Sequence, residues 1–342
     1  MSRLTESQKR EIRHNIYEQL WQDERISLAS MARNLGLARN TVTSHFNYMM
    51  ENEILFPPTL RLKMYKDLRE YVYFLNFKKP LRVYQELERH PHVVYHVLMS
   101  GAFDMIVLAD TPIDFESHPN FEGCFLQGPR SDYYYAHVSR DSYQEAFHKI
   151  KKIIETADFE ESQITMDFPK NEIKWSELEW KLFYDLKYNM RRPFTDIVKK
   201  HGISKWLFYQ CYDRIKGNCI TTVPYYPLGL PNYSDFYIIL KTQYEKDLLD
   251  LYLKIPCAGV TFKVKDYLLA WINVVRTYSF KEFFGLLYGM CDHGLASDLT
   301  YAIPVTYAIP KTSPMTGRHL DMDEYGRVGR KERKNKNKMT LP

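Results

Sequence analysis

The feature that most constrains this sequence is an internal repeat with a period of 166 residues. Shifting the chain by 166 positions places apolar residues on apolar residues over about a hundred positions. The aligned residues include one stripe of an amphipathic helix in each copy, Ile12, Ile16 and Leu20 against Leu178, Leu182 and Leu186. Residue identity is low, so the burial pattern rather than the residues is repeated. We therefore expect two tandem copies of one folding unit.

Composition indicates a globular protein of a reducing compartment. The chain has 342 residues, 45% hydrophobic and 26% charged, which is enough for two or more domains. Its longest apolar runs, such as Ile106–Ala109, are far shorter than the ~20 residues of a membrane helix. Five scattered cysteines do not form a disulfide framework, and the first residues lack the apolar core of a signal peptide. We expect a cytoplasmic protein without membrane contact.

The net charge of +5 is confined to the C-terminal tail. Residues 311–342 contain nine basic and four acidic residues, which leaves 38 of each sign (47 less 9, 42 less 4) in the first 310 residues. A basic segment with few large apolar residues is expected to be disordered. Such a tail either binds nucleic acid through counterion release or is simply solvated. The charge alone therefore does not identify a nucleic-acid-binding protein.

The first part of each copy is typical of a winged helix-turn-helix. In the first copy the predicted helices cover 6–22, 28–35 and 38–51. Ser27 is placed as the N-cap of the second helix, and Gly36 supplies the left-handed residue of the sharp turn that follows. The segment 54–64, with Pro57 and Pro58 at its bend, predicts a wing of two short strands.

The second part of each copy alternates strand and helix patterns. In the first copy these are a strand at 71–77, a helix at 80–89, a strand pair at 92–99 and 103–110, a strand near 133–138 and a helix at 141–156. This arrangement is typical of a ferredoxin-like βαββαβ domain. The predicted class is α+β, with winged helix-turn-helix domains at 1–66 and 167–232, ferredoxin-like domains at 67–166 and 233–310, and the tail at 311–342.

The third helix of the first copy has the pattern of a helix that reads DNA. Val42, Phe46 and Met49 are spaced to face inward. The residues left for solvent are short or basic, Arg39, Asn40, Thr43, Ser44 and Asn47. Arg suits guanine and Asn suits adenine, and each bidentate pair supplies ~1–3 kcal/mol of discrimination.

Three further cations are expected to hold phosphates. Arg33 precedes the turn, and Arg61 and Lys63 lie in the predicted wing. Contacts to phosphate set the register of the protein on the duplex rather than its sequence preference. The predicted partner is thus double-stranded DNA. The alternative is a three-helix bundle whose polar face binds nothing.

The second copy departs from this pattern on the same helix. Its matching positions are Lys205, Trp206, Tyr209, Gln210 and Asp213. Large aromatic residues and a carboxylate replace compact donors, and a carboxylate repels phosphate. Exposed aromatic residues also mark protein interfaces. This helix is therefore a second DNA contact or a packing surface.

The order of parts resembles the Lrp/AsnC family of transcription regulators. The residues that carry the resemblance are the helix-turn-helix at 28–46, Glu53-Ile-Leu, and the strand pair at 90–107 with its Gly-x-x-Asp signature at Gly101 and Asp104. The resemblance covers about 1–110 well and 167–310 as a degenerate copy, with Tyr267 and Ala270 in place of Gly101 and Asp104. Residues 111–132 are an insertion relative to the family.

The resemblance implies an effector site and a paired assembly. In the family, sensing domains pair through their sheets, and amino-acid-like effectors bind near the Gly–Asp loop. Carried over, Ser100, Gly101, Ala102, Phe103 and Asp104 would line such a site. The assembly would be a homodimer or a pseudo-dimer within one chain.

Two other functions are possible on this architecture. Sirohaem decarboxylases share it and use His and Arg at a tetrapyrrole site, and His90, His92 and His96 lie close together here. The Trp/Arg-Pro-Tyr-Asn-Leu stretch of those enzymes is missing, and no metal-ligand spacing, phosphate loop or nucleophile motif occurs. We therefore expect no enzyme, no cofactor and no metal. The remaining alternative is a protein-interaction scaffold, for which 27 Tyr and 19 Phe supply anchors.

Overall fold

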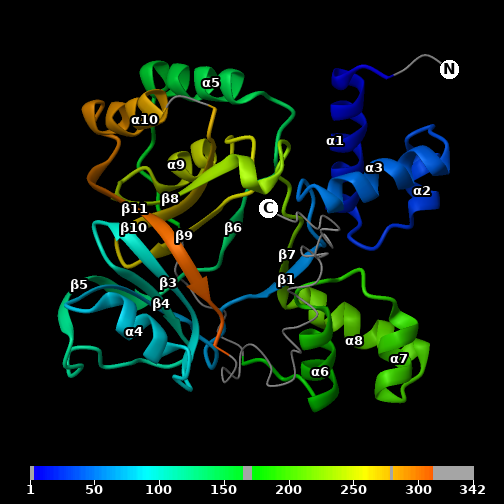
Figure 1. The fold of residues 1–342 in the computed structure, drawn as a ribbon, viewed down its shortest axis with the longest axis horizontal. Helices are drawn as coiled ribbons and strands as arrows, with labels where there is room; N and C mark the ends of the chain where they lie inside the picture. Colours follow the sequence, from blue (N-terminus) through cyan, green and yellow to red (C-terminus); the bar gives the residue numbers. More distant parts are fainter. Residues whose placement is uncertain (1–3, 165–171, 278–279, 311–342) are drawn as a thin grey trace, which may run out of the picture.

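The computed structural model describes residues 4–164, 172–277 and 280–310. It consists of a helical region and a sheet region that lie side by side along the longest axis of the molecule (Figure 1). The helical region contains α1–α3 and α6–α8, and the sheet region contains nine strands with α4, α5, α9 and α10. The basic tail at 311–342, predicted to be disordered, lies outside the described residues.

The first helical unit has the three predicted helices. They are α1 (Glu6–Gln22), α2 (Leu28–Asn34) and α3 (Arg39–Glu51). Ser27 caps α2, because its side chain accepts a hydrogen bond from the backbone N–H of Ser30 at 3.0 Å. Gly36 has φ +63°, the left-handed conformation that the turn requires. The helices enclose an apolar core that includes Ile16, Leu20, Met31, Val42 and Met49.

The second helical unit also has three helices. Its helices are α6 (Glu177–Leu186), α7 (Phe194–His201) and α8 (Lys205–Gly217). Gly202, which lies 166 positions after Gly36, has φ +62° at the equivalent turn. Its core includes Leu182, Leu186, Phe208 and Ile215. The apolar pattern that aligned the two halves thus corresponds to matching helices in space.

A two-stranded ribbon connects the two helical units. Strand β1 (Thr59–Leu62) pairs in antiparallel fashion with β7 (Cys219–Thr222), with Thr59 opposite Thr222. The predicted wing of two strands within 54–64 is therefore wrong, since this segment contributes one strand. Pro57 and Pro58 have no backbone N–H to donate across a local hairpin, whereas pairing with β7 satisfies the backbone of both units.

The sheet region is a single antiparallel sheet. Its strands are β2 (Tyr71–Phe77), β3 (Val93–Gly101), β4 (Met105–Ala109), β5 (Phe121–Pro129), β6 (Tyr134–Tyr135), β8 (Tyr233–Lys241), β9 (Val260–Val264), β10 (Tyr267–Val275) and β11 (Ser297–Ala308). Their order is β5-β2-β4-β3-β11-β8-β10-β9-β6. Pairing of β3 with β11 joins the strands of the first half of the chain to those of the second.

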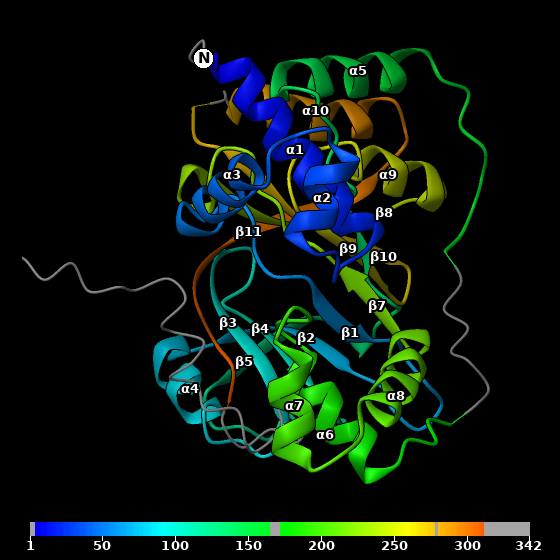
Figure 2. The same cartoon turned by 90° about the vertical axis from the view of Figure 1, so that its right-hand side faces the viewer.

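The second half of the sheet has the strand order β11-β8-β10-β9. The chain runs β8, α9 (Glu245–Tyr252), β9, β10, α10 (Phe280–Asp292), β11, so both helices are crossovers between strands. Apolar residues of β8 and β10 pack against α9 and α10. In Figure 2, α5, α9 and α10 lie together at one end of the sheet region and α4 lies at the other.

The first half departs from the predicted order. The strand expected near 133–138 is reduced to β6, which pairs with β9 at the far edge. Strand β5 pairs with β2, at the position in the sheet where the strand near 133–138 was expected. This strand lies within the insertion at 111–132 and is the next strand after β4 along the chain. Helix α5 (Tyr143–Thr156) covers the second half of the sheet, where the Phe147 and Phe283 rings lie 6.2 Å apart. Helix α4 (Pro80–Leu87) packs on the first half.

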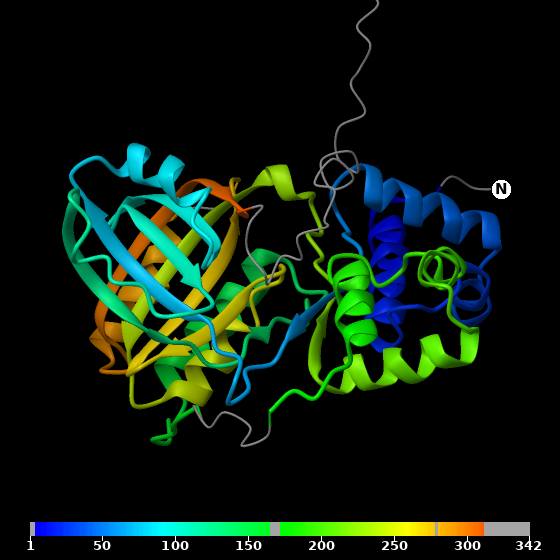
Figure 3. The same ribbon diagram turned by 90° about the horizontal axis from the view of Figure 1, so that it is seen from below.

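The sheet curls so that its two halves face each other across an apolar interior. An antiparallel bridge between Arg130 and Val264 brings the end of β5 to β9. The interior includes Val72, Phe74, Phe103, Ile239, Phe262 and Leu269, drawn from both halves. The curled sheet is visible end-on in Figure 3. Burial of the apolar residues on both inner faces therefore holds the two halves of the sheet together.

A substitution at Gly101 tests how closely the backbone of β3 approaches that of β11. It has φ +136°, and a Cβ there would lie 2.9 Å from the carbonyl oxygen of Tyr301. We expect Gly101→Ala to lower the free energy of unfolding by about 1–3 kcal/mol in urea denaturation, because the backbone is strained and β11 must shift. Gly123→Ala, where a Cβ meets nothing within 4 Å, is the control and should change it by less than about 0.5 kcal/mol. Equal effects of the two substitutions contradict the close approach.

Candidate nucleic-acid interface

The predicted reading face of α3 is exposed. Arg39, Asn40, Ser44 and Asn47 are exposed and Thr43 is half-buried, while Val42 and Met49 are buried. Within the part of the chain that the structure describes, none of the five polar side chains has a hydrogen-bond or ion-pair partner. The amphipathic pattern of this helix is therefore confirmed, and its polar groups are free to bind a ligand.

Basic residues of α1 lie beside α3. The Arg13 guanidinium carbon lies 4.0 Å from the centre of the Tyr48 ring, on the last turns of α3. Burial, together with the charges of Arg13 and Lys9, lowers the pKa of His45 on α3. Arg33 on α2 is exposed, with Nη2 3.3 Å from the Ser30 hydroxyl. Positive charge therefore flanks the polar face of α3.

Arg61 and Lys63 lie away from this face. The Arg61 guanidinium carbon lies 5.4 Å from the centre of the Tyr188 ring, at the junction with the second helical unit. Lys63 Nζ donates a hydrogen bond to the carbonyl oxygen of Gly217 at 3.3 Å. The prediction that both hold phosphates depended on a free wing, and β1 is instead paired with β7. Lys63 therefore contacts the second unit, and Arg61 lies between that unit and Tyr135 of β6.

The second helical unit presents an aromatic surface on α8. Trp206 is 68% exposed and Tyr209 is 39% exposed, and Lys205 and Gln210 are also exposed. The Tyr209 ring lies 5.9 Å from that of Phe194 on α7, so it is partly supported from below. The structure therefore brings the four predicted residues together on one exposed face. Figure 3 shows α3 and α8 on opposite flanks of the helical region.

A reciprocal pair of arginines joins the two helical units. Arg25 donates to the carbonyl oxygens of Met190 and Arg192, the latter at 3.0 Å. Arg191 donates to the carbonyl oxygens of Glu24 and Ile26, at 3.2 and 2.8 Å. Each arginine and its acceptors lie 166 positions from their counterparts, so the contact is isologous within one chain. We call these four hydrogen bonds the arginine clamp.

A buried ion pair reinforces the arginine clamp on one side. Glu24 is 5% exposed, and its carboxylate accepts from Tyr212 at 2.6 Å and lies 2.7 Å from Lys216 Nζ. Burial alone would raise the pKa of Glu24, but the hydrogen bonds from Lys216 and Tyr212 hold it below its ordinary value. Both partners lie on α8, so the pair fixes α8 against the turn that follows α1.

The predicted effector residues serve the packing of the sheet. Phe103 is fully buried in the interior, and Asp104 Oδ2 accepts from the backbone N–H of Phe77 at 2.9 Å. Gly101 lies against Ala302 of β11. Ser100 and Ala102 are exposed. The five residues therefore have different surroundings in the structure, and their role in an effector site stays a prediction.

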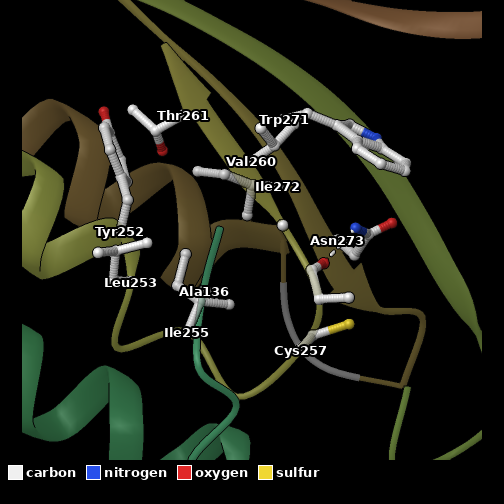
Figure 4. Close-up of a pocket in the computed structure, with 12 residues that line it drawn as sticks. Ala136, Tyr252, Leu253, Ile255, Cys257, Val260, Thr261, Trp271, Ile272 and Asn273 are labelled. Carbon is white, nitrogen blue, oxygen red and sulfur yellow. Dashed lines mark hydrogen bonds between the residues drawn. The ribbon is translucent and has the colours of Figure 1, made fainter. Parts of the chain in front are cut away.

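A small internal cavity lies between α9, β9 and β10. Its volume is about 10 Å³, which is room for a single water molecule. Figure 4 shows the Tyr252 side chain on one side of it and the Trp271 ring on the other. The cavity is therefore too small for an effector.

Sequence reasoning missed a polar cluster in the sheet interior. Asp235 and Tyr237 on β8 pair with Asn273 and Trp271 on β10, and Tyr95 of β3 lies beside Tyr237. We call these five residues the inter-sheet cluster, because they lie between the two facing halves of the curled sheet. Burial raises the pKa of Asp235, and the Trp271 indole N–H and the Asn273 side-chain Oδ1 are buried without a partner among the described residues. Only the alternation of polar with apolar residues along 233–241 and 267–275 signalled this cluster.

The three predicted histidines do not converge. His96 is fully buried with Nε2 3.0 Å from the carbonyl oxygen of Tyr84, while His92 is half-exposed beside Asp110. The His90 and His92 rings lie 6.1 Å apart. Over residues 4–164, 172–277 and 280–310, no three His, Cys, Asp or Glu side chains are grouped as metal ligands. In the same residues, no helix is long and apolar enough to cross a membrane.

Comparisons with known proteins agree with parts of this picture. A family model described as winged helix-turn-helix DNA-binding matches residues 9–55. The solved structure of the siroheme decarboxylase NirDL is similar over 90% of this chain and 96% of that one, at 10% identity and a TM-score of 0.52. Its complex with an iron-uroporphyrin III analogue covers 91% and 99%, at 9% identity and a TM-score of 0.48. Among curated proteins, none matches the sequence.

A further solved structure is similar to part of the chain. A transcriptional regulatory protein of the AsnC family from Pyrococcus furiosus covers 37% of this chain and 89% of its own, at 18% identity and a TM-score of 0.28. The expectation that the chain is not an enzyme is contradicted, because the NirDL structure that matches nine tenths of it at a TM-score of 0.52 is that of an enzyme. Residues 9–55 form a winged helix-turn-helix DNA-binding domain within a mixed α+β chain.

The Glu24 carboxylate provides a test of how the helical units are joined. We expect Glu24→Gln to lower the free energy of unfolding in urea by about 1–3 kcal/mol at pH 7, because hydrogen bonds to a buried charge are lost. Since the folded-state pKa is lowered, the stabilisation is full above the ordinary value of ~4.3 and is lost as the pH falls through the folded-state pKa. The two proteins should therefore converge in acid. Glu155→Gln, in an exposed pair with Lys151, is the control, and an equal loss there contradicts the assignment.

Proposed function

We propose that this protein binds double-stranded DNA in a sequence-specific manner and acts as a transcription regulator. The observation that carries the proposal is the exposed face of α3, whose five polar side chains have no partner within the described residues. The winged helix-turn-helix match at 9–55 supports it. A free polar face on the second helix of a helix-turn-helix is suited to the major groove.

The polar side chains of α2 and α3 divide into two roles. Arg39 presents a guanidinium to guanine, and Asn40 and Asn47 present carboxamides to adenine, with Thr43 and Ser44 as adaptable donors. Arg33 holds a phosphate at the start of the turn. The basic residues of α1 beside α3 add attraction to the backbone of the duplex.

We further propose that the chain is a tandem duplication that acts as an intrachain pair. The winged helix-turn-helix units are 1–66 and 167–232, and the ferredoxin-like domains are 67–166 and 233–310, with β6 and α5 of the first domain packed on the second. The matching turns at Gly36 and Gly202 and the arginine clamp support a two-fold relation between the copies. In this arrangement one chain supplies both halves that a homodimer would otherwise supply, and it functions in the cytoplasm.

The face of α8 is a second contact surface of this assembly. Lys205 and Gln210 supply a charge and a hydrogen-bonding group, and Trp206 and Tyr209 supply apolar area. The two roles left open by the sequence, a second DNA contact and a protein contact, both use an exposed face of this kind. Selection of bound DNA separates them, because a second contact enlarges the selected site.

Selection from a random DNA library tests the α3 assignment. We expect an enriched motif whose affinity falls steeply with salt, and we expect Arg39→Ala to weaken binding by about 1–3 kcal/mol and to relax the preference at one base pair. Arg82→Ala, an exposed arginine on α4, is the control and should leave both unchanged. Binding that disappears only when residues 311–342 are removed would contradict the proposal, since the tail would then be the DNA-binding element.

A second candidate function is binding and decarboxylation of a tetrapyrrole. The observation that favours it is the inter-sheet cluster, where buried polar atoms of Trp271 and Asn273 lack partners among the described residues and face the sheet interior. The fold similarity to NirDL over nine tenths of the chain is the reason to consider this substrate class. Asp235 and Tyr237 would then bind polar groups of the ring.

Titration with iron-uroporphyrin III tests this second candidate. If it is right, the protein shifts the absorbance of the tetrapyrrole, and Trp271→Phe weakens binding about tenfold by removing a donor of ~1.4 kcal/mol. Trp206→Phe, on the exposed face of α8, is the control and should bind as the parent does. Decarboxylation is followed as loss of carboxylate mass. An unchanged spectrum at saturating protein removes this candidate.

A further inference from the structure

A cavity of about 440 Å³ lies between α5, residues 137–141 and the end of α9. This volume falls in the range of small-molecule sites, ~300–1,000 Å³. Its lining shares no residue with the face of α3 or with the inter-sheet cluster. The molecule therefore has a ligand-sized space that neither candidate function uses.

The charge of the lining is positive. Lys149, Lys152 and Lys254 line the cavity together with one carboxylate, Asp141. Lys149 Nζ lies 2.8 Å from both carboxylate oxygens of Asp141, so these two charges offset each other. Lys152 and Lys254 form no ion pair within the described residues. Two uncompensated cations therefore face one cavity.

The rest of the lining adds an apolar wall and an anchored rim. Ile153 and Leu253 line the cavity and pack against the core beneath α5 and α9. His137 lies on the rim, and its Nε2 is 3.0 Å from a carboxylate oxygen of Glu18 on α1. The adjacent Val138 bonds to α1 through its carbonyl oxygen, 2.9 Å from the His14 ring. The rim is therefore held in place by the first helical unit.

We propose that the cavity between α5 and α9 is a binding site for a small organic anion. Lys152 and Lys254 hold the anionic group, and Ile153 and Leu253 contact the apolar body of the ligand. The chemical class is a phosphate or carboxylate attached to a ring or short hydrocarbon. A ligand bound here touches residues 137–141, which also anchor α1, so the site is placed to sense an effector.

Calorimetric titration of the full-length protein with phenyl phosphate tests the site. We expect binding, and we expect the double substitution Lys152→Ala with Lys254→Ala to weaken it about tenfold or more, because two charges near the anion are removed. Both lysines are exposed, so the variant should keep the melting temperature of the parent. Benzyl alcohol, which has the ring without the charge, should bind far more weakly.

Lys151→Ala is the matched control. It removes the same charge from the neighbouring position of α5, where Lys151 pairs with Glu155 and does not line the cavity. Affinity for phenyl phosphate should be unchanged in this variant. The proposal is overturned if the double variant binds as tightly as Lys151→Ala, if benzyl alcohol binds as tightly as phenyl phosphate, or if no binding is seen up to about 10 mM.

Discussion

The relation between the two halves of this protein depends on the arginine clamp. Arg25 and Arg191 each reach across to two carbonyl oxygens of the opposite unit, and the 166-residue shift converts one set of contacts into the other. A guanidinium presents several donors in a fixed fork, so two acceptors on one turn define its position and orientation. The clamp holds the turn after α1 against the turn after α6. The β1–β7 ribbon and the β3–β11 pairing then continue the same relation into the sheet.

The two helical units differ around this shared contact. Glu24, Tyr212 and Lys216 form a buried hydrogen-bonded group on one side, whereas the positions related by 166 residues are Met190, Phe46 and Met50. The arginine–ring contact is common to both sides, since Arg25 lies 5.8 Å from the centre of the Tyr212 ring and Arg191 lies 5.4 Å from that of Phe46. The exposed faces of the corresponding helices also differ. Helix α3 presents polar side chains, whereas α8 presents Trp206 and Tyr209. One unit presents compact polar side chains on its third helix, and the other presents an aromatic surface.

Local features of the sequence predicted local structure well. The helices of the first unit, the cap at Ser27 and the turn at Gly36 were predictable because each depends on residues within a few positions of one another. The pairing of strands was less predictable. The segment 54–64 was expected to pair with itself and 133–138 to complete the first half of the sheet, yet each pairs with a strand far along the chain. Alternation along a strand specifies its faces and not its partner. The Gly101–Asp104 pattern also packs closely on β11 and caps the backbone at Phe77, and its role in an effector site stays a prediction.

The central claim is that one chain carries the pair of helix-turn-helix units needed to bind a DNA site. The mass of the protein–DNA complex tests this claim most directly. Light scattering on a complex with a selected duplex measures this mass. The account predicts one 40.8 kDa chain per duplex, because the arginine clamp already supplies the two-fold contact. Two chains per duplex at saturation would show that the pairing occurs between molecules and would contradict the account.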